Sequence, residues 1–473
     1  METLPRHVTP HDRAVRGIVA RKASPPGDQG ELVLPDGRTD PVALLSAQDA
    51  VRVPELVPVR HERMSASPFT FYRGAAAVMA MDLAAGPVSG LGVQICGDAH
   101  LSNFGLFASP ERRLLFDIND FDETTRGPWE WDVKRLAASL VVSGRENGFD
   151  RKTRRKVVVG TVGRYRDAMV GFAGMRQLDA WYARADVDEA KALLESRLSK
   201  AGKRGFDKTV AKARGSDSLK AFRKLTWVVD GQRRIKADPP LVVPLTDLLP
   251  DVAREALESQ IRSLLGRYRR TLPSDRQVLL DRFDYVDMAR KVVGVGSVGT
   301  RCWIVLLQGR DEEDPLFLQV KEAQSSVVEP FVPHPLRPRH RPANEGKRVV
   351  DGQRLMQAAS DLFLGWERAE GIDGTQRDFY VRQLRDQKGS FPVEQMVPRG
   401  MRLYGELCGW TLARAHARSG DAVAIAAYLG EGDDVFPKAM ADFAERYADQ
   451  NERDHRRMVE GLRQGALAGV SAG

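Results

Sequence analysis

Ile-Cys-Gly-Asp-Ala-His-Leu-Ser-Asn-Phe-Gly occupies residues 95–105, and Leu-Leu-Phe-Asp-Ile-Asn-Asp-Phe-Asp-Glu follows at residues 114–123. Two apolar runs, residues 93–96 and 114–116, each end in an acidic cluster. This pattern is typical of buried strands that bring carboxylates to one edge of a sheet. The sequence therefore predicts an active site at that edge.

Spacing within these clusters indicates a specific chemistry. Asp98 and Asn103 are five residues apart, as are the Asp and Asn of the protein-kinase catalytic loop, where the Asp accepts the substrate hydroxyl proton and the Asn holds Mg²⁺. Asp120, with Asp117 and Asp122 as alternatives, stands where the second metal-binding Asp of such a site would fall. The two clusters thus predict a base, Asp98, and two metal ligands, Asn103 and Asp120.

The same residues carry a family resemblance. The run Gly97-Asp-Ala-His-Leu-Ser-Asn103 resembles the G-D-x-H-x-x-N loop of the aminoglycoside phosphotransferase and choline kinase branch of the kinase-like fold. Asp132, twelve residues after Asp120, resembles the Asp that opens the next helix of that branch and braces its catalytic loop. Cys96 departs from the pattern, because the branch usually has His there.

The whole chain also resembles an uncharacterised bacterial family, domain of unknown function 2252. Four stretches carry this second resemblance: Phe71-Tyr-Arg-Gly74, the Asp98 loop, Asn119-Asp-Phe-Asp-Glu123 and Val320-Lys-Glu-Ala323. It implies no particular activity.

Composition sets the class of protein. The 473 residues suit two lobes or domains, and 42% hydrophobic with 29% charged residues describes a globular protein. The net charge of +8 is spread along the chain, which favours an ordinary solvated surface over nucleic-acid binding. We find no apolar leader, no run of about 18 apolar residues and no cysteine cluster. A cytoplasmic protein without membrane contact is expected.

A glycine-rich segment lies about two hundred residues further on. Gly294, Gly296 and Gly299 have G-x-G-x-x-G spacing, which Rossmann loops share. A Rossmann loop opens a helix, whereas here a strand-like run follows at residues 302–307, and then Lys321 at the end of another strand. This context favours the kinase glycine-rich loop and its β3 lysine, so these residues are predicted to bind the phosphates of ATP.

Two further residues are candidates for the nucleotide site. A kinase-like lysine needs a carboxylate to orient it, and Glu329 is the nearest one after Lys321, with a predicted helix at residues 350–366 as the alternative source. Arg73 falls in a predicted helix that Ser67 and Pro68 begin and Gly86 ends, and it either lies on the surface or contacts phosphate.

Taken together, these patterns predict an α+β, two-lobed protein-kinase-like fold in circularly permuted order, because the catalytic loop precedes the glycines. The expected parts are an N-terminal arm at residues 1–64, a helical lobe at 65–283, a small antiparallel β lobe at 284–390 and C-terminal helices at 391–473. The chain would return to the helical lobe through a hinge near Arg385. Two lobes with mostly internal contacts can be joined in either order.

The predicted function is ATP- and Mg²⁺-dependent transfer to a hydroxyl of a small molecule or a protein. One alternative is a metal-dependent phosphohydrolase that uses Asp98, His100 and the Asp117, Asp120 and Asp122 cluster. Another is a regulatory module that binds nucleotide without turnover. The acceptor, the choice between phosphate and AMP as the transferred group, and the oligomeric state stay open at this point.

Overall fold

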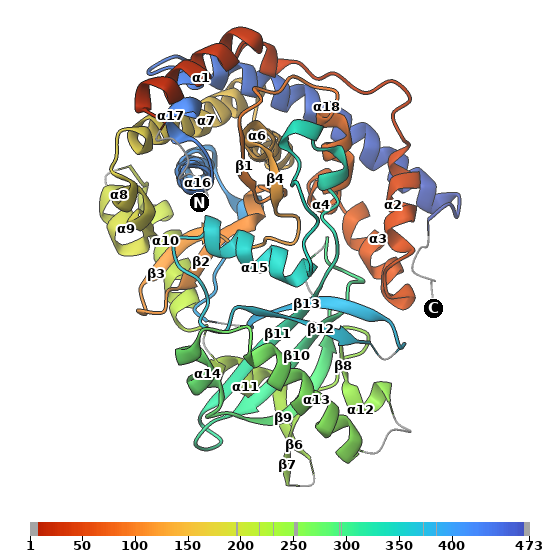
Figure 1. Cartoon of the computed structure of the whole chain (residues 1–473). Coiled ribbons are helices and arrows are strands. Elements are labelled where there is room, and N and C mark those ends of the chain that lie inside the picture. Colours follow the sequence, from red (N-terminus) through yellow and green to blue (C-terminus); the bar gives the residue numbers. More distant parts are fainter. Residues whose placement is uncertain are drawn as a thin grey trace, which may run out of the picture.

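The computed structural model confirms the expected α+β class. It describes residues 8–194, 197–216, 218–229, 231–249, 254–292, 294, 296–371, 373–384 and 386–467. In this part of the chain every paired strand is antiparallel to its neighbours. The largest sheet lies at one end of the molecule, and the long helices gather at the other (Figure 1).

The largest sheet has six strands in the order β12-β13-β11-β10-β9-β8. In chain order they are β8 (Val242–Pro244), β9 (Asp284–Lys291), β10 (Cys302–Gln308), β11 (Pro315–Ala323), β12 (Gly365–Glu370) and β13 (Gln376–Gln383). Successive side chains of a strand point to opposite faces of a sheet. Both faces of β10 are buried accordingly: Ile304 packs in the same cluster as Phe222, and Val305 packs with Tyr268.

Helices on both faces make this sheet into a layered unit. Phe222 belongs to α11 (Ser218–Leu225) and Tyr268 to α13 (Arg254–Arg269), and α14 (Ser274–Leu280) adds Leu280 to the second cluster. Residue 284, where the sequence predicts the small lobe to begin, lies inside this layer, because β8 precedes it and pairs with β9. The hairpin of β6 (Thr226–Val229) and β7 (Gln232–Ile235) lies at the edge of the unit.

The opposite end of the molecule is a helical assembly around the largest hydrophobic cluster. Its long helices are α6 (Trp129–Glu146), α7 (Arg151–Ala173), α16 (Pro398–Ser419), α17 (Ala422–Leu429) and α18 (Val435–Arg463). Shorter helices flank them: α8 (Gln177–Tyr182), α9 (Val187–Leu194) and α10 (Lys200–Arg214). Another short helix, α12 (Leu245–Leu248), adjoins β8 in the sheet unit. No described helix is both long and apolar enough to span a membrane.

Two small sheets position the acidic clusters. β1 (Gly92–Ile95) pairs with β4 (Thr125–Pro128), and β2 (Phe104–Ala108) pairs with β3 (Leu114–Ile118), which pairs with β5 (Ala185–Asp186). The first acidic cluster lies in the connection from β1 to β2, and the second lies in the connection from β3 to β4. Both connections therefore emerge from the same small sheets.

The N-terminal segment is helical. It comprises α1 (Pro10–Ala23), α2 (Pro41–Asp49), α3 (Val57–Ser65), α4 (Pro68–Gly74) and α5 (Ala76–Leu83). The single helix predicted from Ser67 to Gly86 is in fact two, because the backbone at Ala75 leaves helical geometry with φ −113° and ψ 35°. The helix predicted at residues 350–366 is also different: α15 covers Glu345–Met356, and Trp366 belongs to β12.

Candidate active site

Asp98 lies in a loop that the first turn of α6 holds in place. Asp132 accepts hydrogen bonds from the backbone amides of Cys96 and Gly97, at 2.8 and 3.0 Å. This confirms the predicted bracing role of Asp132. Gly97 has φ +80°, and a side chain there would lie 2.3 Å from the carbonyl oxygen of Glu123. The close approach of the two acidic loops thus requires glycine at position 97.

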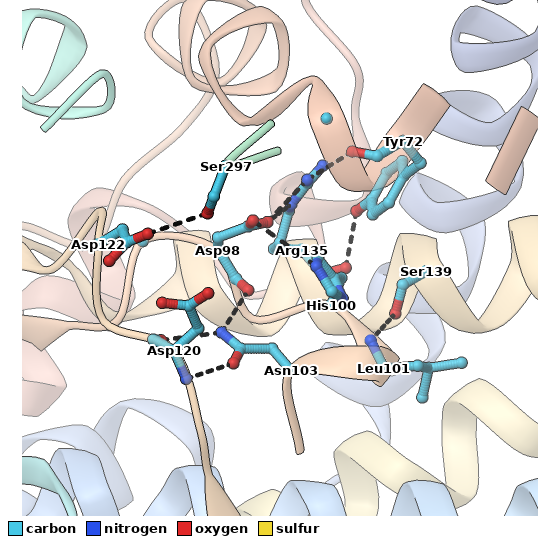
Figure 2. Close-up of polar contacts among 12 residues, drawn as sticks. Tyr72, Asp98, His100, Leu101, Asn103, Asp120, Asp122, Arg135, Ser139 and Ser297 are labelled. Carbon is cyan, nitrogen blue, oxygen red and sulfur yellow. Dashed lines mark hydrogen bonds and ion pairs between the residues drawn. The ribbon is translucent and has the colours of Figure 1, made fainter. Parts of the chain in front are cut away.

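Arg135, one helical turn beyond Asp132, pairs with Asp98 (Figure 2). Its Nε and Nη2 lie 2.8 and 2.7 Å from Asp98 Oδ1, and its guanidinium stacks 3.9 Å from the ring centre of Tyr72. Burial raises the pKa of Asp98, and the charge of Arg135 opposes this shift. Oδ1 takes both guanidinium contacts, and Oδ2 lies 3.7 Å from His100 Nε2.

Asn103 joins the two acidic loops. Its Nδ2 donates to the carbonyl oxygens of Asp98 and Asp120, each at 3.0 Å, and its Oδ1 accepts from the Asp120 amide at 2.7 Å (Figure 2). The amide oxygen therefore already has one partner, and a second lone pair is available for a metal ion.

Asp120 has an unsatisfied oxygen. Its Oδ1 is buried without a hydrogen-bond partner, and the Lys321 ammonium is 3.6 Å away. Burial, together with the negative charge of Asp122, raises the pKa of Asp120, while Lys321 and Arg382 lower it. A buried carboxylate oxygen in this state is suited to a bound cation.

Lys321 reaches the acidic loops from β11 of the large sheet. Its Nζ lies 2.6 Å from Asp122 Oδ2, and its side chain is 3% exposed. Asp122 also accepts hydrogen bonds from the hydroxyls of Tyr380, at 2.6 Å, and Ser297, at 3.2 Å. Burial would raise the pKa of Asp122, but Lys321 and these hydrogen bonds lower it to about 2. Asp122 is thus ionised and paired with the lysine.

The glycine-rich segment contributes to the same place. Gly294 and Gly296 line a cavity of about 270 Å³ together with Asp98, Asn103 and Asp120. Gly299 does not line it: its φ is +90°, its carbonyl accepts from the amide of Val53 at 2.8 Å, and a side chain there would meet Arg52. Residues 293 and 295 lie outside the described part of the chain.

Glu329 and Asp117 lie away from this cavity. Glu329 accepts from the hydroxyl of Thr125 at 3.5 Å, and among the described residues the ion-pair partners of Lys321 are Asp120 and Asp122. Asp117 forms a fully buried pair with Arg414 at 2.6 Å. The expected hinge at Arg385 lies outside the described residues, while the neighbouring Gly389 exchanges backbone hydrogen bonds with Leu106 of β2.

Several residues of the site carry no motif that would have predicted them. Arg348 of α15 donates to the carbonyl oxygens of Asp122, Thr124 and Gln324. Two more cations, Arg382 and Lys388, line the cavity, and burial, together with the charge of Arg382, lowers the pKa of Lys388 to about 7. Of these residues, Arg135 alone could have been predicted from the sequence, because it is three positions after Asp132 and therefore lies on the same face of the helix.

Comparison with known proteins identifies one similarity. Residues 52–461 match the model of a family described as an uncharacterized protein conserved in bacteria (DUF2252). The match includes both acidic loops, the glycines and Lys321. Neither the curated proteins nor the solved structures contain a match to the chain.

Proposed function

Given that the chain belongs to the DUF2252 family of conserved bacterial proteins, we propose from its site that it is an ATP- and Mg²⁺-dependent phosphotransferase acting on a hydroxyl of a small molecule or a protein. The ion pairs of Lys321 with Asp122 and Asp120 carry this proposal. They join a strand-end lysine, preceded by a glycine-rich loop, to the second acidic loop, which Asn103 joins in turn to Asp98. Asp120 and Asp122 line the same cavity as Asp98, Gly294 and Gly296, and Lys321 lies behind them without lining it.

In this proposal Asp98 positions the acceptor hydroxyl and takes its proton. The acceptor oxygen forms a bond to the terminal phosphorus of ATP, the bond from that phosphorus to the bridging oxygen breaks, and ADP leaves. Arg135 holds Asp98 through Oδ1, so that Oδ2 meets the hydroxyl in a fixed geometry. Such positioning is most of what a protein contributes to phosphoryl transfer.

Mg²⁺ would be held by Asp120 and Asn103. The Oδ1 of Asp120, which accepts no hydrogen bond and has only the 3.6 Å contact with Lys321, and the free lone pair on Asn103 Oδ1 fit this role. No group of three or more acidic, His or Cys side chains forms a metal cage in the described part of the chain. Mg²⁺ needs none, because it is usually bound by one or two carboxylates, water and substrate phosphates. When bound, it would neutralise charge on the phosphates.

The nucleotide phosphates would contact Lys321 and the backbone of the loop at Gly294 and Gly296. Lys321 lies on the third strand of the run β9, β10, β11, as does the lysine of protein kinases. We therefore retain the circularly permuted, two-lobed kinase-like fold as part of the proposal. Asp122, in place of Glu329, is the carboxylate that orients the lysine.

The two rival functions receive less support. A phosphohydrolase would use His100 as a metal ligand, and the lowered pKa of its ring, caused by burial and Arg73, would suit that role. However, Asp98 is its neighbouring carboxylate, at 3.7 Å, and no group of three or more possible metal ligands includes His100 among the described residues. A regulatory module that binds nucleotide without turnover would not need a carboxylate that an arginine holds in place, as Arg135 holds Asp98.

A labelling experiment tests the proposal. The purified protein is titrated with ATP, with and without Mg²⁺, and then incubated with ATP labelled at either the α- or the γ-phosphate and a panel of hydroxyl compounds and proteins. We expect Mg²⁺-dependent binding and transfer of the γ-label. Transfer of the α-label would indicate nucleotidyl transfer instead, and absence of Mg²⁺-dependent binding would overturn the proposal.

A further inference from the structure

Arg73 lines the active-site cavity without a partner for its charge. The residue lies in the last turn of α4, and its side chain faces the cavity beside Asp98 and His100. Its Nε is buried and makes no hydrogen bond, and no described residue forms a hydrogen bond or ion pair with its guanidinium. Asp98 and Glu394 act on it only through space.

Neighbouring arginines differ from Arg73 in this respect. Arg135 pairs with Asp98, Arg382 donates to the carbonyl of Asn119 at 2.9 Å, and Arg348 donates to three carbonyls. Burial lowers the pKa of Arg73, and the charges of Asp98 and Glu394 only partly offset this shift. A largely buried guanidinium with no bonded anion is costly to the folded protein. An anionic ligand would remove that cost.

Arg73 is also held rigidly between two parts of the site. A capping box of Ser67 and Thr70 fixes the start of α4, and the Tyr72 carbonyl accepts from Arg135 at 2.6 Å. On the other side, a side chain at Gly296 would lie 3.3 Å from the Arg73 carbonyl, so the glycine-rich loop abuts this turn. The backbone of Arg73 is thereby fixed next to the glycine-rich loop, and its side chain lines the cavity that Asp98 and Gly296 also line.

We propose that Arg73 binds a phosphate group beside Asp98. A planar guanidinium with free donors suits a phosphate through two parallel hydrogen bonds. This phosphate is either the terminal phosphate of the nucleotide or a phosphate carried by the acceptor, whose hydroxyl would then lie next to Asp98. The assignment of either source rests on the proposed function, whereas phosphate binding by Arg73 does not.

Calorimetry with inorganic phosphate tests the site directly. Wild type is compared with Arg73→Ala, with Arg73→Lys, which keeps the charge but loses the paired donors, and with Arg151→Ala, which removes an exposed arginine at the start of α7. We expect Arg73→Ala to weaken phosphate binding roughly 10-fold to 100-fold, the loss of a charge-assisted contact. Arg73→Lys should weaken it less, and Arg151→Ala not at all. Equal phosphate affinity in wild type, Arg73→Ala and Arg73→Lys would overturn the inference.

A second arm repeats the titration in the presence of Mg²⁺ and a non-hydrolysable ATP analogue. If phosphate still binds to the analogue-saturated protein, Arg73 serves the acceptor. If the analogue excludes phosphate and Arg73→Ala weakens the analogue, Arg73 serves the nucleotide. If the protein binds phosphate through Arg73 but does not bind the ATP analogue, the proposed function is wrong and the inference about Arg73 is supported. If the protein binds the analogue but substitution of Arg73 does not change its affinity for phosphate, the inference about Arg73 is wrong and the proposed function is supported.

Discussion

Asp98 and Asp120 share a cavity but have different surroundings, which predict different losses on substitution. In the proposed mechanism Asp98 accepts the proton, so Asp98→Asn should lower transfer by roughly 10²- to 10⁴-fold while Mg²⁺-ATP affinity stays within about twofold. Asp120→Asn removes the carboxylate with the unpaired oxygen, so Mg²⁺-ATP binding itself should weaken. Calorimetry and transfer assays on both variants separate the two roles. Wild-type behaviour of both variants would exclude this cavity as the active site.

Glu123, next to Asp122, predicts a pH dependence of stability. Burial, with the charges of Asp122 and Asp98, raises its pKa from 4.5 to about 7, against the opposing effect of Arg348 and the Val327 amide. The folded protein therefore keeps a proton that the unfolded chain releases, and this contribution to stability is lost as the pH rises from 4.5 to about 7.

Glu123→Gln, which has no charge to bury, should consequently be more stable than wild type at about pH 8, by about 1–3 kcal/mol, with little difference at about pH 5. Urea unfolding at both pH values measures the effect. Glu111→Gln, at an exposed position, serves as the control and should show no such pH-dependent gain. A Glu123→Gln variant that is equally destabilised at both pH values would contradict the assigned pKa.

The residues of the site were predictable where a short motif contains them. Asp98, Asn103 and Asp120 belong to spacings of a few residues, and the structure brings all three to one cavity. The partner of Lys321 was not predictable in this way, because Asp122 is 199 residues away in the chain. Nearness in sequence suggested Glu329, which instead contacts Thr125. A contact between residues so far apart in the sequence depends on how the helices and strands pack.

Asp117 shows how one acidic residue can join elements instead of binding metal. Its carboxylate links β3 to α16 through Arg414 and accepts from the amide of Ala358 at 2.8 Å. Asp117→Asn leaves a buried guanidinium without its anion and should lower the free energy of unfolding by about 3–5 kcal/mol. Chemical denaturation measures the loss. The folded fraction should bind Mg²⁺-ATP like wild type, and a stable variant that binds no nucleotide would make Asp117 a metal ligand.

Helix ends were predicted less well than helix positions, for identifiable reasons. Periodicity alone extended one helix over residues 350–366, but Trp366 pairs with Tyr380 in the sheet, and this strand pairing outweighs the local pattern. The actual helix begins after Asn344, whose side chain caps it by accepting from the Lys347 amide at 2.9 Å. In the N-terminal segment, Gly74 packs against Met64 where the two helices part, a contact that sequence spacing does not reveal.

Two segments that are far apart in the sequence meet at the candidate active site. The acidic loops belong to the small sheets beside α6, and Lys321 and Ser297 belong to the large sheet and its glycine-rich loop (Figure 1). Only tertiary contacts join them: Lys321 and Ser297 both bond to Asp122, and Arg348 of α15 binds the backbone of the same loop. If the two parts act as one site, their contact must contribute to the stability of the whole protein.

A double-mutant cycle on Lys321 and Asp122 measures this contribution. Lys321→Met leaves the Asp122 carboxylate without its cation and should cost about 3–5 kcal/mol, and Asp122→Asn, which leaves Lys321 only the longer pair with Asp120, should cost less. The double variant should lose much less than the sum, because neither member of the 2.6 Å pair remains. Lys347 and Asp351, an exposed pair on α15, form the control cycle with an expected coupling of about 0.3–0.5 kcal/mol. Urea unfolding provides all the values. A Lys321 and Asp122 coupling no larger than the control would mean that the two parts merely touch, and the shared nucleotide site would lose its main support.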